Sequence, residues 1–464
     1  MRTLKSLWSK VARPPVIVEG PVSRFYAALP IAIVGAWWLI CFAFYATGWP
    51  IQYNRGNLGL VSLLFGSTLV LVVAGFGVVV WRKVIRPQAR ASAEDGLKQL
   101  PWAMVVAVVA VVALYIPLSE TYSGFHFWEV VPALADQGLA YQLATDRIEE
   151  GTASRLAIVA VQTLLSPLTL AALPFLALQW FENRRHLALL LVILAIAVFT
   201  SILGGRDFQL VLSALLVAVA WVTARVRRGV GFRLVDIGVL GGIGLVGVFL
   251  FGLRKQSRMG NLPYCPEGAD VCAIPGVPTL WDTITVTVSS YLSQGFEGLG
   301  RALDATWSFG GGYSHSPALS GFASTLFGIE NDKVVTAQLE GLDWSATANW
   351  STGFAMIAND VPWVLVPLVV AASAVLLGFA WRITLTRGDW LSTGVFGYTF
   401  VSLFFMPMNL QLAISGPLYL GYLALVVLFI ARAVAQKLRR PSEGDEGARM
   451  APILDWEVAG RPVV

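Results

Sequence analysis

The sequence predicts an all-α polytopic membrane protein, and the prediction rests on three observations. Of the 464 residues, 56% are hydrophobic and only 13% are charged, a balance outside that of ordinary soluble domains. The apolar residues gather in runs of about 20, the length of a helix that crosses a hydrocarbon core of roughly 30 Å. Many of the 17 Trp residues stand near the ends of these runs, as in the aromatic belts of membrane proteins.

Ten runs are long and apolar enough to form transmembrane helices. In chain order they cover about 24–46, 57–81, 101–118, 154–180, 187–203, 208–224, 235–253, 361–381, 391–407 and 417–431. Two additional crossings around residues 281–303 would bring the number to twelve. The first residues are basic and show no short apolar core with a small-residue cleavage site, so we expect no cleaved signal peptide.

The runs divide the chain into four parts. These are an N-terminal bundle of about seven helices (1–253), a large external loop (254–360), the C-terminal helices (361–431) and a tail (432–464). The tail has the Pro, Gly and charge content of a disordered segment.

The Lys and Arg residues predict the orientation, because they are kept on the cytoplasmic side during insertion. With the N-terminus inside, most of the 33 Lys and Arg residues fall in inner segments, and both termini are cytoplasmic. The net charge of +5 is therefore a signal of topology rather than of nucleic-acid binding. Inner clusters such as Arg225, Arg227, Arg228 and Arg233 can also meet anionic membrane lipid.

Two predicted outer loops, 119–153 and 254–360, are long enough to carry binding or catalysis. Cys265 and Cys272 lie in the second loop, and their spacing suits a small disulfide-closed loop in an oxidising compartment, with free thiols as the alternative. We expect no metal site, because no His or third Cys is near them. Cys41 lies in the first apolar run and is expected to be a small buried side chain.

Arginines mark the outer ends of two helices. Arg206 follows two glycines in a turn between two apolar runs, and Arg254 and Arg258 follow the next run at the same face. Guanidinium groups bind phosphate oxygens through paired, charge-assisted hydrogen bonds, so these residues predict a site for a lipid-linked diphosphate. The alternative is that they anchor helix ends by extending to the membrane surface.

The stretch NWSTGFAMIANDVP, residues 349–362, re-enters the membrane after the large loop. If it is helical, Asn349 and Thr352 share a face and Asp360 returns close to it, so the three polar groups would line one cavity. The alternative is a sheltered helix start in which Asn349 and Thr352 act as caps.

The spacing of Asn349, Thr352, Phe354 and Asp360 resembles a segment of Wzy-type O-antigen and oligosaccharide repeat-unit polymerases. Val361 and Pro362 replace the Phe-Gly that usually follows the Asp in that family. The turn at Gly205-Arg206, the later Arg254 and the Tyr291–Gly295 segment also resemble features of these enzymes. The resemblance spans about residues 200–381.

The resemblance implies a GT-C-like membrane glycosyltransferase in the bacterial cytoplasmic membrane, with its active site on the outer face. Such an enzyme moves a glycan from undecaprenyl diphosphate onto another lipid-linked repeat unit with inversion, and undecaprenyl diphosphate is released. The product is a surface or extracellular polysaccharide. No nucleotide sugar or other cofactor is implied, a regulator of chain length is a candidate partner, and the sequence has no P-loop or Rossmann fingerprint.

Transfer needs a base for the attacking hydroxyl and an electrophilic clamp on the diphosphate. Asp360 and His315 are the first base candidates, with Asp207 and Glu297 behind them. His315 lies in a glycine- and serine-rich stretch that reads as a mobile lid or as a plain flexible loop.

Residues 280–303 are too polar for a clear span, and they predict an interfacial or re-entrant helix that presents Tyr291 and Glu297 to the acceptor glycan. Together with Asn349 and Thr352 these form the predicted glycan-binding set. A helical hairpin that covers the cavity is the alternative.

Two other functions stay open. An O-antigen ligase shares the donor and the arginines and differs only in the acceptor. A polytopic lipid or polysaccharide transporter is the other, although such proteins usually carry ionisable groups deep within their spans, and the predicted spans hold almost none.

Overall fold

The computed structural model describes residues 24–53, 55–81, 101–149, 153–259, 269–272, 279–329, 331–345 and 349–438. In chain order its elements are α2 (Arg24–Thr47), β1 (Ile51–Tyr53), α3 (Leu58–Val80), α5 (Trp102–Tyr122), α6 (Val130–Ala135), α7 (Gln137–Glu149), α8 (Ala153–Asn183), α9 (Leu187–Leu203), α10 (Phe208–Arg227), α11 (Leu234–Met259), β2 (Ala269–Cys272), α12 (Leu280–Ala302), α13 (Pro317–Phe327), η1 (Ala337–Leu342), α14 (Gly353–Ala358), η2 (Trp363–Leu365), α15 (Val366–Thr386), α16 (Trp390–Phe405), η3 (Gln411–Ile414) and α17 (Gly416–Leu438).

Each of the ten predicted apolar runs forms a helix: α2, α3, α5, α8, α9, α10, α11, α15, α16 and α17. Within the described residues, seven helices are long and apolar enough to cross a membrane: Phe25–Thr47, Leu58–Val80, Trp102–Tyr122, Ala157–Asn183, Phe208–Arg227, Trp363–Thr386 and Gly416–Gln436. Three more apolar helices are shorter, namely Leu187–Leu203, Gly244–Arg254 and Trp390–Phe405. The protein is therefore a polytopic α-helical membrane protein.

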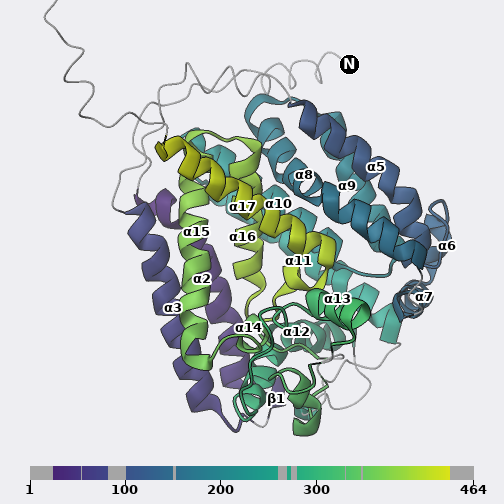
Figure 1. Ribbon diagram of the computed structural model, residues 1–464, viewed down its shortest axis with the longest axis vertical. Coiled ribbons are helices and arrows are strands. Elements are labelled where there is room, and N and C mark those ends of the chain that lie inside the picture. The colour runs from purple at the N-terminus through teal and green to yellow at the C-terminus, as the bar shows by residue number, and fades with distance from the viewer. Residues whose placement is uncertain are drawn as a thin grey trace, which may run out of the picture.

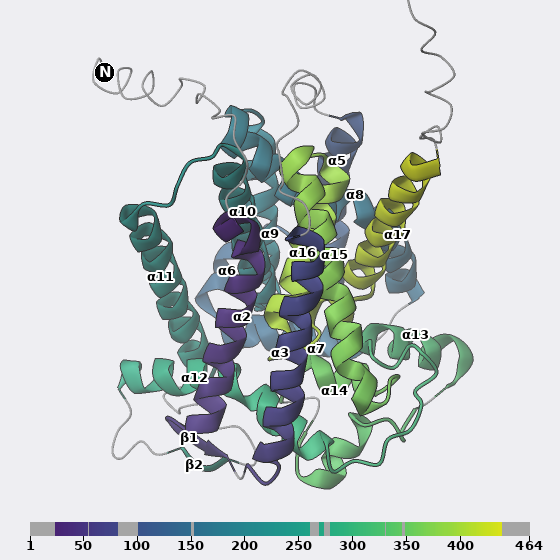
Figure 2. The ribbon, with the colours of Figure 1, turned by 90° about the vertical axis from the view of Figure 1, so that its left-hand side faces the viewer.

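The ten helices run alternately up and down, so the chain has two distinct ends (Figures 1 and 2). One end, here called the loop end, carries α12, α13 and α14. The other, here called the basic end, carries the arginines at the α8–α9 and α10–α11 connections and the end of α17. Helices satisfy their own backbone hydrogen bonds, which is why apolar runs of this length adopt them in lipid.

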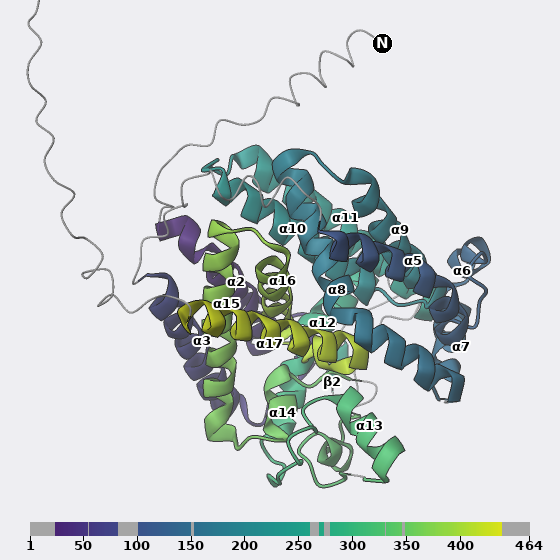
Figure 3. The same ribbon diagram turned by 45° about the horizontal axis from the view of Figure 1, so that its top comes forward.

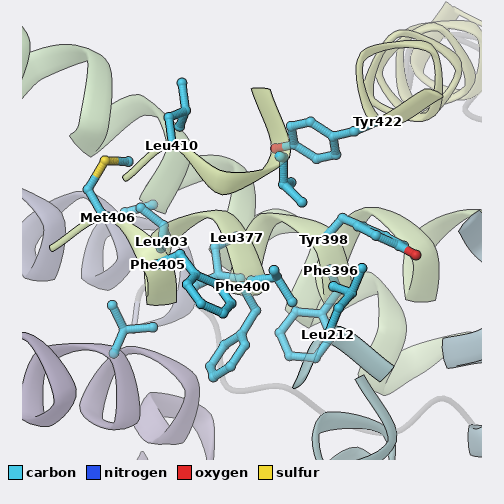
Figure 4. Packing of buried hydrophobic residues seen from close by; sticks show 14 of the residues in the cluster. Leu212, Leu377, Phe396, Tyr398, Phe400, Leu403, Phe405, Met406, Leu410 and Tyr422 are labelled. Carbon is cyan, nitrogen blue, oxygen red and sulfur yellow. The ribbon is translucent and has the colours of Figure 1, made fainter. Parts of the chain in front are cut away.

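Helix α16 lies at the centre of the bundle and is surrounded by α8, α10, α15 and α17 (Figure 3). Nearly every residue of α16 is buried, and Figure 4 shows its aromatic side chains packed against Leu212 of α10 and Leu377 of α15. Two indole groups donate hydrogen bonds between helices. Trp38 Nε1 of α2 donates to Leu403 O of α16 at 2.7 Å, and Trp381 Nε1 of α15 donates to Ala27 O of α2 at 3.1 Å. These bonds satisfy buried polar atoms inside an apolar core.

Helix α12 is the polar segment expected to lie at the interface or to re-enter the membrane. It begins with a capping box, in which Thr279 and Asp282 each bond to the other's backbone N–H. The Thr279 side-chain and backbone hydrogen bonds lower the pKa of the Asp282 carboxyl. The cap is therefore fully formed above the ordinary carboxyl pKa and weakens as the pH falls through the lowered value.

Beyond its first turns α12 is buried against α2, α3, α11 and α14 at the loop end (Figure 2). Two of its glycines allow this approach. A Cβ on Gly295 would lie 2.2 Å from Pro407 O, and one on Gly298 would lie 2.7 Å from Trp350 O. Side chains would therefore hold α12 away from both neighbouring backbones.

A two-stranded antiparallel sheet was not expected in an all-α chain. Strand β1, after α2, pairs with β2 in the large loop, with Ile51 opposite Cys272 and Tyr53 opposite Ala269. The side chains of Ile51 and Tyr53 are buried. The sheet ties the large loop to the first helical hairpin at the loop end.

The basic end is held together by Arg227, at the end of α10. Its guanidinium donates to Glu182 of α8 and to the carbonyls of Thr384 and Leu385 of α15. The side chains of Arg227 and Glu182 are about one-tenth exposed, 11% and 10%. One side chain thus connects three helices.

Two predictions about the extent of helices differ from the structure. Helix α17 continues to Leu438, past the predicted start of the tail, because its sequence keeps helix-forming residues after the apolar run ends. The rest of the predicted tail, 439–464, lies outside the described residues. Residues 349–360 do not form one helix: only Gly353–Ala358 are helical. The single-face geometry predicted for Asn349, Thr352 and Asp360 is therefore wrong.

Candidate functional site

Asp360 and His315, the two leading base candidates, are in direct contact at the loop end. His315 Nδ1 lies 2.6 Å from Asp360 Oδ2, and His315 Nε2 lies 2.5 Å from the hydroxyl of Tyr419. The Asp360 side chain is 6% exposed and the His315 side chain 22%. The three side chains form a continuous hydrogen-bonded line from the turn before α15, through the loop before α13, to the first turn of α17.

The glycine-rich loop around His315 is held in place by the Asp360 carboxylate. Gly312 N donates to Oδ1 at 2.9 Å and His315 N donates to Oδ2 at 2.7 Å. A Cβ on Gly310 would lie 2.7 Å from Asp360 Oδ1, and Gly311 and Gly312 have φ near +80°. Glycine is required here both for the close approach and for the left-handed backbone.

Asn359, beside Asp360, completes the attachment of this loop. Its Nδ2 donates to Ser314 O at 2.9 Å and to Thr336 Oγ1 at 2.8 Å, and its own carbonyl accepts from Gly310 N at 2.8 Å. The stretch predicted as a lid or a flexible loop is therefore fastened to the turn that carries Asp360. Asn359 was not named from the sequence, although its place next to Asp360 was a usable signal.

The hydrogen bonds assign the proton on the His315 ring. A carboxylate only accepts, so Nδ1–H donates to Asp360, and in the neutral imidazole Nε2 is then the acceptor for the Tyr419 hydroxyl. A carboxylate on Nδ1 fixes the tautomer and stabilises the imidazolium that forms when Nε2 takes a proton. The arrangement can act as a general base toward a hydroxyl placed where the Tyr419 oxygen now lies.

Arg254 lies in a second polar cluster at the same end, at the junction of α7, α9, α10 and α11. It forms an ion pair with Asp207, donates from Nε to Gln137 Oε1 at 2.8 Å and donates to Ser201 O at 2.9 Å. The side chains of Arg254 and Asp207 are 16% and 14% exposed. Asp207, a secondary base candidate, is thus the ion-pair partner of Arg254, which was predicted to bind the diphosphate. Gln137 and Ser201 were not named from the sequence.

Arg206 lies in the turn just before Asp207, and its side chain is exposed. The turn is compact because Gly205 has a φ of +58°, and a Cβ there would lie 2.5 Å from Tyr141 N of α7. Arg206 and Arg254 therefore share one region, as predicted. Arg258 lies in α11, and its side chain is outside the described part of the structure.

The predicted glycan-binding residues before α14 are buried. Thr352 caps α14 by accepting from Ala355 N, which matches the capping alternative. Asn349 is 3% exposed and its backbone N–H donates to Ser345 O at 2.8 Å.

The predicted glycan-binding residues of α12 are also packed. Tyr291 stands edge-on to Trp350, with ring centroids 4.6 Å apart. Glu297 is 3% exposed and forms an ion pair with Arg301 at 3.0 Å. The binding of a glycan by these residues stays a prediction.

The described residues hold no group of three or more His, Cys, Asp or Glu that could bind a metal ion. Cys41 is a free, buried thiol, as expected for the first apolar run. Cys265 lies outside the described residues, and only the backbone of Cys272, in β2, is within them. The predicted disulfide therefore stays a prediction.

Tyr419 is the residue of the line that the sequence reasoning missed. It lies in the last apolar run, where a tyrosine near a helix end is ordinarily an interfacial anchor. Only the meeting of α17 with the loop before α13 gives its hydroxyl a partner.

This chain matches no known protein family, no curated protein and no solved structure.

Proposed function

We propose that this chain is a GT-C-like membrane glycosyltransferase that polymerises oligosaccharide repeat units carried on undecaprenyl diphosphate into a surface or extracellular polysaccharide. The observation that supports this best is the line Asp360–His315–Tyr419, an oriented acceptor nitrogen beside a hydroxyl at the loop end of the bundle. In this proposal the loop end faces outward from the bacterial cytoplasmic membrane, and both termini are cytoplasmic.

In the reaction, the acceptor sugar hydroxyl takes the position next to His315 Nε2 that the Tyr419 hydroxyl holds in the resting state. Its oxygen attacks the anomeric carbon of the donor glycan from the side opposite the diphosphate, with inversion. The new C–O bond forms as the bond to the diphosphate oxygen breaks, and the electron pair leaves with undecaprenyl diphosphate. The hydroxyl proton passes to Nε2, and Asp360 stabilises the imidazolium.

The arginine cluster supports the departure of the diphosphate. Arg206 and Arg254 lie together at the loop end, where the head of a polyprenyl lipid would meet the membrane surface. Guanidinium groups stabilise the negative charge that grows on the leaving diphosphate. Asn349, Thr352, Tyr291 and Glu297 are proposed to shape the glycan site.

The test supplies purified protein in detergent with a lipid-diphosphate-linked repeat unit from its own host and separates the glycan products by size. The expected result is a ladder of regular increments. Asp360→Asn and His315→Gln are expected to lower the rate by about 10²- to 10⁴-fold, the usual contribution of a general base. Tyr419→Phe keeps the ring and is expected to leave the ladder in place with an altered pH profile.

Glu340→Gln is the matched control, because Glu340 is an exposed carboxylate of η1 in the same outer region. It should behave as the wild type does. Transfer of a single block onto a different lipid acceptor would mark an O-antigen ligase instead. No transfer, together with movement of lipid across vesicles, would overturn the enzyme proposal and favour a transporter.

A further inference from the structure

Helix α11 stands apart from the bundle over its middle. From Gly241 to Val248 every residue whose side chain is described is exposed, on all sides of the helix. A Cβ on any of Gly238, Gly241, Gly242, Gly244 or Gly247 would meet nothing within 4 Å. Figure 2 shows α11 at the left edge of the molecule, joined to other helices near its lower end. Its main helical neighbours are α12 and α7.

Both ends of α11 are nevertheless joined to α10 by ion pairs. At the basic end, Arg225 pairs with Asp236 at 2.7 Å, and the rings of Trp221 and Phe232 lie 5.7 Å apart. At the loop end, Arg254 pairs with Asp207.

Helix α12 closes the loop end further. A Cβ on Gly252 would lie 2.3 Å from Ile284 Cγ1, and the ring of Phe251 lies 5.1 Å from that of Tyr291. Helices α10 and α11 are therefore joined at both ends while the middle of α11 stays uncovered, and the space between these two joints is here called the α10–α11 window. It extends from Asp236 to Gly252, about 24 Å at 1.5 Å per residue.

The walls of the window are apolar and partly without side chains. Gly247 lies two helical turns before Arg254, on the same face, and Val211 lies one turn after Asp207. The faces that meet at the Arg254–Asp207 pair therefore continue as Gly247 and Val211. Val211 is 43% exposed, so neighbouring helices leave it partly uncovered at that depth.

We propose that the α10–α11 window holds the isoprenoid chain of a polyprenyl diphosphate, with its head beside Arg254 and Arg206. The window lies within the apolar part of the bundle, so its occupant is apolar there. Its loop end opens at the arginine cluster, so the occupant carries an anionic head. The choice of a polyprenyl chain over a phospholipid acyl chain rests on the proposed function.

The test fills the window with one large side chain. Gly247→Trp narrows it, and Leu245→Trp is the matched control, because Leu245 is 73% exposed and lies on nearly the opposite face of α11. Each variant is given the host repeat unit on its natural polyprenyl diphosphate and the same repeat unit on a short alkyl diphosphate.

Gly247→Trp is expected to lower kcat/KM at least tenfold for the polyprenyl substrate and to leave the short-chain substrate within twofold of the wild type. Leu245→Trp should change neither. Wild-type kinetics of Gly247→Trp with the polyprenyl substrate would overturn the window while leaving the polymerase intact.

A binding measurement tests the α10–α11 window independently of the proposed polymerase activity. Protein in detergent is mixed with undecaprenyl phosphate and, separately, with phosphatidylglycerol, and the bound lipid is measured by native mass spectrometry. The window predicts preferential retention of undecaprenyl phosphate by the wild type and its loss in Gly247→Trp. Equal retention of both lipids, or retention unaffected by the substitution, would overturn it, even if the wild type transfers no glycan.

Discussion

Gly310 is the residue on which the position of the His315 loop depends most directly. A Cβ there would lie 2.5 Å from Ser314 Cβ, 2.6 Å from Asn359 O and 2.7 Å from Asp360 Oδ1. Gly310→Ala is therefore expected to push the loop off the turn and to lower the transfer rate on the order of 100-fold, as displacements of about 1 Å do in active sites. The measurement is kcat in the glycan-ladder assay, with thermal stability determined in parallel.

Gly321→Ala is the control for that substitution. Gly321 lies in α13, and a Cβ there meets nothing within 4 Å, so this variant should keep its activity. Equal activity of both variants would show that the loop position does not matter for the reaction.

At the residue scale, the sequence indicated which side chains are candidates for the chemistry but not which of them are in contact. Asp360 could be named because the resemblance to the polymerases reaches it, and His315 because it lies in a glycine- and serine-rich stretch. Their contact could not be predicted, since 45 positions separate them in the chain and the intervening segment contains α13, η1 and α14. Tyr419 lies 104 positions after His315 and has no distinguishing neighbour in the sequence.

At the scale of elements, α12 makes the sharpest prediction. A Cβ on Gly295 would lie 2.2 Å from Pro407 O, whereas one on Gly300 would be in ordinary contact, 3.4 Å from the Tyr45 hydroxyl. Gly295→Ala should cost about 1–3 kcal/mol of stability by overpacking. Gly300→Ala should be neutral or slightly stabilising, because Ala favours helix.

The measurement is the thermal unfolding midpoint of each variant in detergent. A midpoint for Gly295→Ala equal to that of Gly300→Ala would contradict the close packing of α12 on the α16–α17 connection.

The apolar runs were predictable as elements because hydropathy alone selects helices in lipid. The position of α12 was not, because its buried face mixes serines, threonines and apolar residues and gives no spanning signal. The β1–β2 sheet was not predicted, because strands of three and four residues have too few alternating positions to be recognised in the sequence.

At the scale of the whole molecule, the proposed orientation predicts which surface each end presents. Glu340 is exposed at the loop end, and Gln436 is exposed at the basic end. Glu340→Cys in intact spheroplasts should react with a membrane-impermeant maleimide, and Gln436→Cys should react only after permeabilisation. The wild type, which has three cysteines, gives the background.

The reverse labelling pattern would place the Asp360–His315 pair in the cytoplasm and exclude the proposed reaction with an outer-leaflet donor. The positive-inside rule predicts an orientation from the sequence, and the labelling tests it. Contacts between distant helices, such as the three joined by Arg227, depend on shapes that a charge count does not contain.

The β1–β2 pairing also sets an order of events during synthesis. Strand β1 leaves the ribosome with the first two helices, yet its partner follows only after α11. In the proposed orientation, the first hairpin waits on the outer surface with an open strand edge until the later segment crosses the membrane. A nascent chain halted before residue 269 would therefore display an unpaired strand edge, open to pairing with another chain.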